Sequence, residues 1–151
     1  MYKKKILVFG LPGSGKTTLS KKLSEWLPAV HLNADEVRAQ ADDWDFSAKG
    51  RIRQASRMIH LAQRVNFEHV ILDFVCPKKF IRNSLGVDIV VFMDTISESR
   101  YPDTNQIFEF PDPSEKINFH LKTKPSGPKI QFISDEINSL DSNDIVRKMV
   151  S

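Results

Sequence analysis

The stretch FGLPGSGKTT, residues 9–18, follows directly on the apolar run ILVF at residues 6–9. Residues 10–17 fit the pattern G-x-x-x-x-G-K-[ST] at every position. Glycines let the backbone fold around an anion with its N–H groups turned inward, and a helix beginning near Lys16 adds the positive end of its dipole. The stretch therefore predicts a phosphate-binding loop between a buried strand and a helix. The residues expected to bind the nucleotide are Gly10, Leu11, Pro12, Gly13, Ser14, Gly15, Lys16, Thr17 and Thr18.

A nucleoside triphosphate bound here needs a cation and a metal site. Lys16 is placed to reach the β- and γ-phosphates, and the hydroxyl of Thr17 can ligate Mg²⁺. The run VILD at residues 70–73 is a buried strand that ends in Asp73, the second carboxylate expected at the metal. The alternative is that Asp73 caps the next helix. ATP and Mg²⁺ are the expected ligands.

Strand and helix patterns alternate along the first 93 residues. Expected strands are 4–9, 29–33, 69–74 and 87–93, and expected helices are 16–27, 34–41, 47–65 and 77–86. This alternation is typical of a parallel sheet. The predicted fold class is α/β, with a three-layer parallel β-sheet that carries helices on both faces, in the P-loop NTPase kinase fold.

After Asp94 the sequence becomes polar and is interrupted by proline. Residues 95–116 form a lid-like segment in which Thr95 and Glu98 match a capping box, so a helical turn is expected there. Residues 117–122 and 129–133 are expected strands separated by a turn at KPSGP, 124–128, and 144–150 an expected closing helix. At 151 residues, the chain is expected to be one domain, 1–151.

The composition is that of an ordinary globular protein, with 40% apolar and 27% charged residues. A formal charge of +3 suits an anionic ligand but does not by itself indicate nucleic acid. The single cysteine, Cys76, excludes an intrachain disulfide, and no apolar run reaches the ~20 residues of a membrane span. These features favour a cytoplasmic protein without a membrane partner. They leave the oligomeric state open, a homodimer included.

The segment NADEVR, residues 33–38, lies at the sheet edge where an acceptor would bind. Asp35 can accept a proton from an attacking hydroxyl or bind Mg²⁺ through water, and Arg38 can hold an anionic acceptor. The alternative is an ordinary helix start with acids at its positive end. No N-K-x-D motif for guanine occurs, so a kinase is favoured over a GTPase.

Four segments together resemble the adenylylsulfate kinase family. GLPGSGKTT is similar to its phosphate loop and LNADEVR to its L-D-G-D-x-V-R segment. DFSAKGRIRQASRMIHLA, residues 45–62, resembles its G-F-S-x-x-D-R-x-x-N-I-R-R segment, and DFVCPKKFIR, residues 73–82, resembles F-I-S-P-Y-R-x-x-R. The resemblance covers about the first two thirds of the chain.

This resemblance implies that ATP phosphorylates a ribose hydroxyl of adenylylsulfate, a step of sulfate assimilation. It implies substrate-binding roles for Asp35, Arg38, Phe46, Arg51, Gln54 and Phe74, and catalytic roles for Lys16, Asp35 and Arg38. Phe46 would stack on the acceptor's base, and Arg38 and Arg51 would hold its phosphosulfate. From the residues alone, Phe46 can equally be a core side chain, and Arg51, Arg53 and Arg57 a solvated helix face.

The chain also departs from that family. Asn33 and Ala34 replace an acid and a glycine, and the lid-like segment is acidic where the family carries an arginine. NADEVR is equally similar to the N-x-D-[DE]-x-R segment of polynucleotide 5′-hydroxyl kinases. A polynucleotide or nucleoside hydroxyl kinase, with nucleic acid as a less favoured partner, and a non-catalytic nucleotide-binding module therefore remain alternatives.

Overall fold

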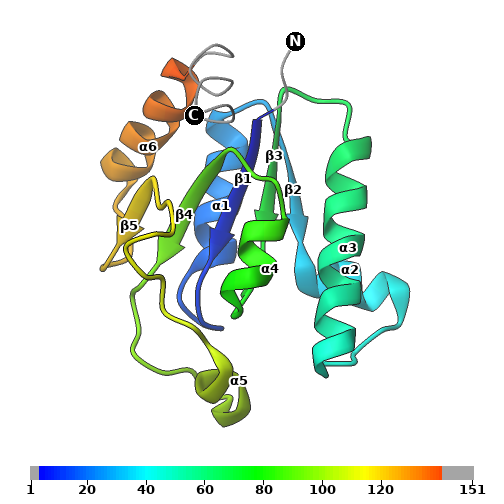
Figure 1. Cartoon of the computed structure of the whole chain (residues 1–151). Helices are drawn as coiled ribbons and strands as arrows, with labels where there is room; N and C mark the ends of the chain where they lie inside the picture. The colour runs from blue at the N-terminus through cyan, green and yellow to red at the C-terminus, as the bar shows by residue number, and fades with distance from the viewer. Residues whose placement is uncertain (1–3, 141–151) are drawn as a thin grey trace.

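The computed structural model describes residues 4–140, which form a five-stranded parallel sheet with helices on both faces (Figure 1). The strand order is β2-β3-β1-β4-β5. The strands are β1 (Lys4–Phe9), β2 (Ala29–Asn33), β3 (His69–Asp73), β4 (Ile89–Met93) and β5 (Phe119–Leu121). The helices are α1 (Lys16–Trp26), α2 (Ala34–Ala41), α3 (Ala48–Arg64), α4 (Lys79–Ser84), α5 (Pro102–Ile107) and α6 (Gly127–Ser139). The predicted α/β fold class with its three layers is confirmed.

Two buried apolar layers hold the helices against the sheet. Alternate residues of a strand point to opposite faces, so Leu7 and Phe9 of β1 pack with α2, α3 and α4, while Ile6 and Val8 pack with α1 and α6. In Figure 1, α4 accordingly lies in front of the sheet and α1 behind it. Both faces being covered explains why the central strands are apolar throughout.

The expected elements of the first 93 residues agree with the observed ones to within two residues at almost every boundary. Ser47 caps α3 by accepting a hydrogen bond from the amide of Gly50, as the sequence indicates. The spacing of Ile52, Ala55, Ile59 and Ala62 predicts the buried stripe of α3, and this prediction is wrong at one position, because Ile52 is half exposed while Met58 is fully buried. The buried stripe of α3 is thus rotated from the expected one.

Two expectations in the last third are wrong. No helical turn begins at Thr95, because its hydroxyl donates to the carbonyl of Ser14 instead of capping, and the helix of this segment starts at Pro102. Residues 129–133 are helical and not a strand, because Ser126 caps α6 and Pro128 occupies its first turn. The closing helix expected at 144–150 lies outside the described residues.

A buried ion pair ties the return arm of the lid-like segment to α4. The side chains of Arg82 and Glu115 are 2% and 5% exposed, and Arg82 also donates to the carbonyls of Cys76 and Glu109. Lys79 and Asp112 form a second pair between the same two segments, at the surface. These contacts fix residues 109–115 and leave residues 95–108 to line the site described below.

Because a buried charge that loses its partner stays desolvated, Glu115→Gln is expected to lower the free energy of unfolding by about 3 kcal/mol. The exposed pair supplies the matched control, since Asp112→Asn should cost less than about 1 kcal/mol. Chemical denaturation of the two variants beside the wild-type chain measures both values. Equal losses in the two variants would contradict the burial argument.

Among residues 4–140, no helix has the length and apolar character needed to cross a bilayer.

Candidate active site

The phosphate loop lies between β1 and α1 in a conformation that its glycines make possible. Gly13 and Gly15 have φ angles of 86° and 101°, a region that other residues rarely adopt. A Cβ on Gly10 would lie 2.5 Å from the carbonyl oxygen of Met93, so glycine is also required for the close approach of β4. The loop therefore ends with free backbone N–H groups at the start of the 11-residue helix α1.

Lys16 lies nearly buried beneath this loop, and its Nζ donates to the carbonyl of Leu11 at 3.1 Å. Burial lowers the pKa of Lys16, while the nearby carboxylates of Asp73 and Asp35 act in the opposite direction. An ammonium group has three donors, so it keeps donors for phosphate oxygens. Lys16 is thus a desolvated cation held at the base of the loop.

Asp73 is the centre of a polar cluster at the carboxyl ends of β2 and β3. Its Oδ2 accepts hydrogen bonds from the hydroxyl of Thr17 at 2.8 Å and from the amide of Asn33 at 2.9 Å, and lies 2.9 Å from Nε2 of His31. Burial alone would raise the pKa of Asp73, but the contacts with His31, Thr17 and Asn33 and the charge of Lys16 hold it below its ordinary value. Asp73 is therefore a carboxylate.

The alternative that Asp73 caps the next helix can be compared with the position of helix α4. Helix α4 begins six residues later, with Lys78 at its N-cap position and no side-chain cap. The helix-cap interpretation is therefore wrong. The parallel register pairs Asn33 with Asp73, which explains why the two side chains meet.

A hydroxyl and a carboxylate oxygen 2.8 Å apart are ligand types that suit Mg²⁺, which in nucleotide sites takes its remaining ligands from phosphates and water. Thr17 and Asp73 therefore fit the metal expected from the sequence. Among residues 4–140, no group of three or more His, Cys, Asp or Glu side chains could hold a metal by itself. Such a site would thus depend on a bound nucleotide.

A cavity of about 1040 Å³ opens from the phosphate loop toward α2 and the lid-like segment. It brings together most of the residues that the sequence singles out. Those residues are Pro12, Gly13, Lys16, Thr17, Asp35, Arg38, Phe46, Arg51, Asp73 and Phe74. Gly10, Leu11, Ser14, Gly15 and Thr18 do not line the cavity; the first four of these shape the loop behind it.

Arg38 lines the cavity from helix α2. It is 4% exposed, and its Nη1 donates to the carbonyls of Asp43 and Asp45 at 2.9 and 3.2 Å. Its guanidinium lies over the ring of Phe46, 4.2 Å from the centroid. Asp35 is exposed at the first turn of α2, close enough to influence the pKa values of both Lys16 and Arg38.

Phe46 is half exposed and contacts two arginines. The guanidinium of Arg51 lies 5.4 Å from its ring centroid, and Nε of Arg51 donates to the carbonyl of Phe46 at 2.9 Å. Phe46 is half exposed and lines the cavity, so the alternative that it is a core side chain is wrong. Phe74, by contrast, is 9% exposed and forms the cavity floor.

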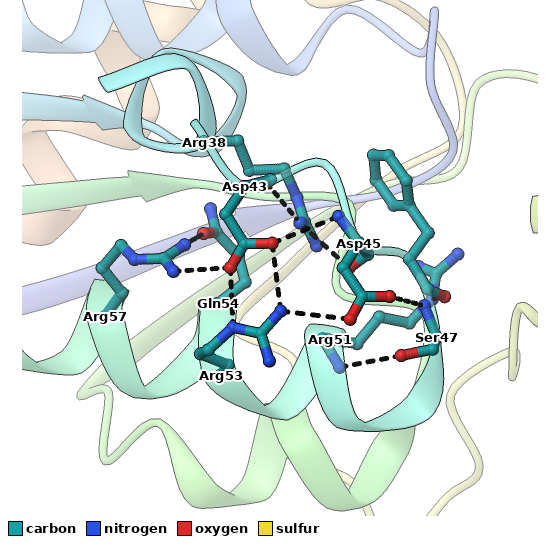
Figure 2. Close-up of polar contacts among 10 residues, drawn as sticks. Arg38, Asp43, Asp45, Ser47, Arg51, Arg53, Gln54 and Arg57 are labelled. Carbon is teal, nitrogen blue, oxygen red and sulfur yellow. Dashed lines mark hydrogen bonds and ion pairs between the residues drawn. The ribbon is translucent and has the colours of Figure 1, made fainter. Parts of the chain in front are cut away.

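Gln54 is not brought to the cavity. Its side chain is fully buried, with Nε2 donating to the carbonyl of Ala34 and Oε1 accepting from Arg57. It joins α3 to α2, which is a structural position. Arg53 and Arg57 also do not line the cavity, and both bind the carboxylate of Asp43 (Figure 2). The side chain of Arg53 is half exposed, as a solvated helix face predicts, whereas that of Arg57 is partly buried.

Several cavity residues and contacts were not expected from the sequence. Trp44 lies beside Phe46 in the loop before α3, and Tyr101 and Arg100 come from the lid-like segment. His31 reaches Asp73 from β2. In the sequence, the contact of His31 with Asp73 is indicated by one feature, which is the position of His31 two residues before the end of the strand, on the same face as Asn33.

Gly50 allows the loop before α3 to lie against that helix. A Cβ there would sit 2.1 Å from the carbonyl oxygen of Asp45, whereas a Cβ on Gly127 meets nothing within 4 Å. Gly50→Ala is therefore expected to lower the free energy of unfolding by about 1–3 kcal/mol, with Gly127→Ala as the matched control. Thermal or denaturant unfolding measures both. Indistinguishable stabilities for the two variants would show that the loop moves away without cost.

Comparison with known proteins agrees with this architecture. A family model described as an AAA domain matches residues 6–55. No curated protein matches the chain. Among solved structures, APE1195 aligns with a TM-score of 0.72 at 19% identity over 91% of this chain and 96% of that one.

Two further structures are kinases. The APS kinase CysC of Mycobacterium tuberculosis in complex with AMPPNP and APS aligns with a TM-score of 0.68 at 19% identity, covering 96% of this chain and 98% of that one. Shikimate kinase from Aquifex aeolicus aligns with a TM-score of 0.59 at 19% identity, covering 89% and 96%. Identities this low establish the fold and not the substrate. The chain has the α/β P-loop kinase fold.

Proposed function

We propose that this protein transfers the γ-phosphate of ATP to a hydroxyl group of a small nucleotide-like acceptor, with adenylylsulfate or a relative as the first candidate. The observation that carries the proposal is the cavity of about 1040 Å³, which joins a phosphate-loop end to an end lined by Arg38, Phe46 and Arg51. Donor and acceptor can occupy one such space together. A role in sulfate assimilation and a cytoplasmic location are proposed together with that acceptor.

The donor end supplies the groups that phosphoryl transfer requires. Backbone N–H groups of the loop and Lys16 would bind the phosphates of ATP, and Thr17 and Asp73 would hold Mg²⁺. The metal, when bound, neutralises charge on the phosphate oxygens. The low pKa of Asp73 keeps its carboxylate ionised at neutral pH, as a metal ligand requires.

At the acceptor end, Asp35 is the general base in this proposal. It is exposed to the cavity and is close enough to influence Lys16, so a hydroxyl between them can lose its proton to Asp35 while facing the donor phosphate. Arg38 and Arg51 would hold an anionic group of the acceptor, and Phe46 and Phe74 its base.

A polynucleotide or nucleoside hydroxyl kinase is the second candidate, supported by one contact. Asn33 occupies the position of the first acid in the adenylylsulfate kinase pattern, and its amide donates to Asp73. Because residue 33 is an amide, Asp73 is the carboxylate of the cluster formed with Thr17, His31 and Asn33. The asparagine also matches the polynucleotide kinase pattern. A nucleotide-binding module without transfer is the remaining outcome.

A transfer assay with γ-labelled ATP and Mg²⁺ tests the proposal. Adenylylsulfate, nucleosides and 5′-hydroxyl oligonucleotides are offered as separate acceptors. Label on adenylylsulfate supports the first candidate, and label on a nucleoside or on the oligonucleotide, with none on adenylylsulfate, supports the second. Tight ATP binding with label on none of the three would overturn the proposal in favour of a binding module.

A further inference from the structure

The loop of residues 42–47, DDWDFS, called here the acidic loop, joins α2 to α3 and forms part of the cavity wall. Figure 2 shows it lying along the first turns of α3, with the carboxylates of Asp43 and Asp45 directed at that helix. Trp44 and Phe46 of the loop line the cavity. Its backbone is bound from the other side by Arg38, whose Nη1 donates to the carbonyls of Asp43 and Asp45.

Asp43 is the hub that fixes this loop. Its Oδ2 accepts from Nε of Arg53 and from Nη2 of Arg57, both at 2.7 Å, and its Oδ1 accepts from Nη2 of Arg53 and from the amide of Asp45. These hydrogen bonds from Arg53 and Arg57 hold the pKa of Asp43 well below its usual range. The loop is thus attached at one point to two turns of α3.

Asp45 and Gly50 form a second attachment that depends on both residues. The carboxylate of Asp45 accepts from the amide of Ser47 and from Arg53, and its Cγ would lie 2.5 Å from a Cβ at position 50. The family pattern G-F-S-x-x-D-R has glycine and aspartate at these two positions, whereas this chain has aspartate and glycine. In this chain the carboxylate stands on the loop, where it accepts a hydrogen bond from Arg53.

These contacts determine the charge that an acceptor meets. Arg53 and Arg57 are occupied by acidic side chains and do not line the cavity. The charged side chains that do line it are balanced in number. They are Lys16, Arg38, Arg51 and Arg100 on the basic side, and Asp35, Asp73, Glu98 and Asp103 on the acidic side.

Aromatic rings are the other prominent feature of this end. Trp44, Phe46 and Tyr101 line the cavity while 52%, 51% and 46% exposed. Tyr101 comes from the lid-like segment and the other two come from the acidic loop. Half-exposed aromatic rings at a cavity wall suit a planar base, since stacking supplies about 1–3 kcal/mol per base.

We propose that the acidic loop is a pre-formed wall of the acceptor site, which selects an acceptor with a planar base and little negative charge. Trp44 is a contact residue for the base, and Asp43 is the positioning residue that fixes the loop. This inference rests on the proposed function, because it takes this end of the cavity as the acceptor end. Between the two candidate functions it favours a nucleoside acceptor over adenylylsulfate. It assigns Arg53 and Arg57 to the wall and not to the acceptor.

Fluorescence tests the role of Trp44, because Trp26 and Trp44 are the protein's two tryptophans. Trp26→Phe leaves Trp44 as the reporter, and Trp44→Phe leaves Trp26, which is equally exposed but does not line the cavity. Each variant is saturated with a non-hydrolysable ATP analogue and titrated with adenosine or ribose. Adenosine should change the emission of Trp44 saturably, with no change from ribose and none at Trp26. No saturable change at Trp44, or equal changes at both tryptophans, would overturn the assignment.

Two substitutions that remove charges of opposite sign test the role of Asp43, both made in the Trp26→Phe background. The measured quantity is the ratio of the Kd for adenosine to the Kd for adenosine 5′-phosphate. Asp43→Asn frees the charge of Arg53 and Arg57, so this ratio should rise about twofold or more, whereas Arg53→Gln should lower it. A loop that is merely loosened would shift both variants in the same direction. Shifts of one sign, or no shift, would contradict the electrostatic role.

These outcomes separate the inference from the proposed function. Saturable binding at Trp44 without any transfer of phosphate would support the wall and refute the kinase. Transfer to an acceptor that has no aromatic ring, with no response at Trp44, would refute the wall and leave the phosphotransferase.

Discussion

Lys16→Met is expected to lower the rate of γ-phosphate transfer by about 10³-fold, which is about 4 kcal/mol of transition-state stabilisation. Lys16 is a nearly buried cation whose Nζ is held by the carbonyl of Leu11, so its charge acts at the phosphates with little screening by water. Methionine keeps the aliphatic stem and removes the charge alone. The measurement is transfer of labelled phosphate to the acceptor identified by the screen.

Lys22→Met is the matched control, because Lys22 is an exposed lysine on the same helix, α1. It should retain the wild-type rate. A Lys16→Met protein that is folded and transfers phosphate at the wild-type rate would contradict the role given to the phosphate loop.

Asp35→Asn is expected to lower transfer by about 10³-fold while leaving the affinity for ATP nearly unchanged. The amide cannot accept a proton from the attacking hydroxyl, whereas the phosphate loop, Thr17 and Asp73 are untouched by the substitution. The measurements are transfer under saturating acceptor and, separately, the Kd for ATP with Mg²⁺.

Glu36→Gln provides the control at the neighbouring position, where the side chain is exposed and does not line the cavity. Its rate and its ATP affinity should both be those of the wild-type chain. Loss of ATP affinity in Asp35→Asn would move Asp35 from the acceptor to the metal. An unchanged transfer rate would remove it from the reaction.

Local patterns were sufficient for most of the fold. The strand, phosphate loop and helix at the start of the chain are read from adjacent residues, and so is the cap that Ser47 places on α3. The run at 129–133 fits a strand as well as a helix, because five residues cannot distinguish the two periods. Ser126 and Pro128, which start helix α6, are equally typical of a turn.

The candidate site was predictable where it lies at strand ends. Val8 and Asn33 both pair with Asp73 in the parallel register, so alternation alone brings the phosphate loop, Thr17 and Asp73 to one edge. The contact of His31 with Asp73 depends on side-chain direction across two strands, which the sequence does not specify.

The acceptor end was less predictable because its contacts join residues that no periodic pattern links. Arg53 and Arg57 read as a solvated face of α3, yet Asp43 binds both from the preceding loop. The same contacts explain why Gln54 is buried, since its Oε1 accepts from Arg57. These pairings, which decide which side chains reach the cavity, could not be inferred from the residue types alone.

We propose that one cavity joins an ATP end to a hydroxyl-acceptor end. The most direct test measures transfer of labelled γ-phosphate by the wild-type chain and by Asp35→Asn to the same acceptor, and determines the ATP binding of both in parallel. We expect acceptor-dependent labelling by the wild-type chain, loss of labelling in Asp35→Asn, and equal ATP binding by both. ATP binding by both without labelled acceptor from either would contradict it.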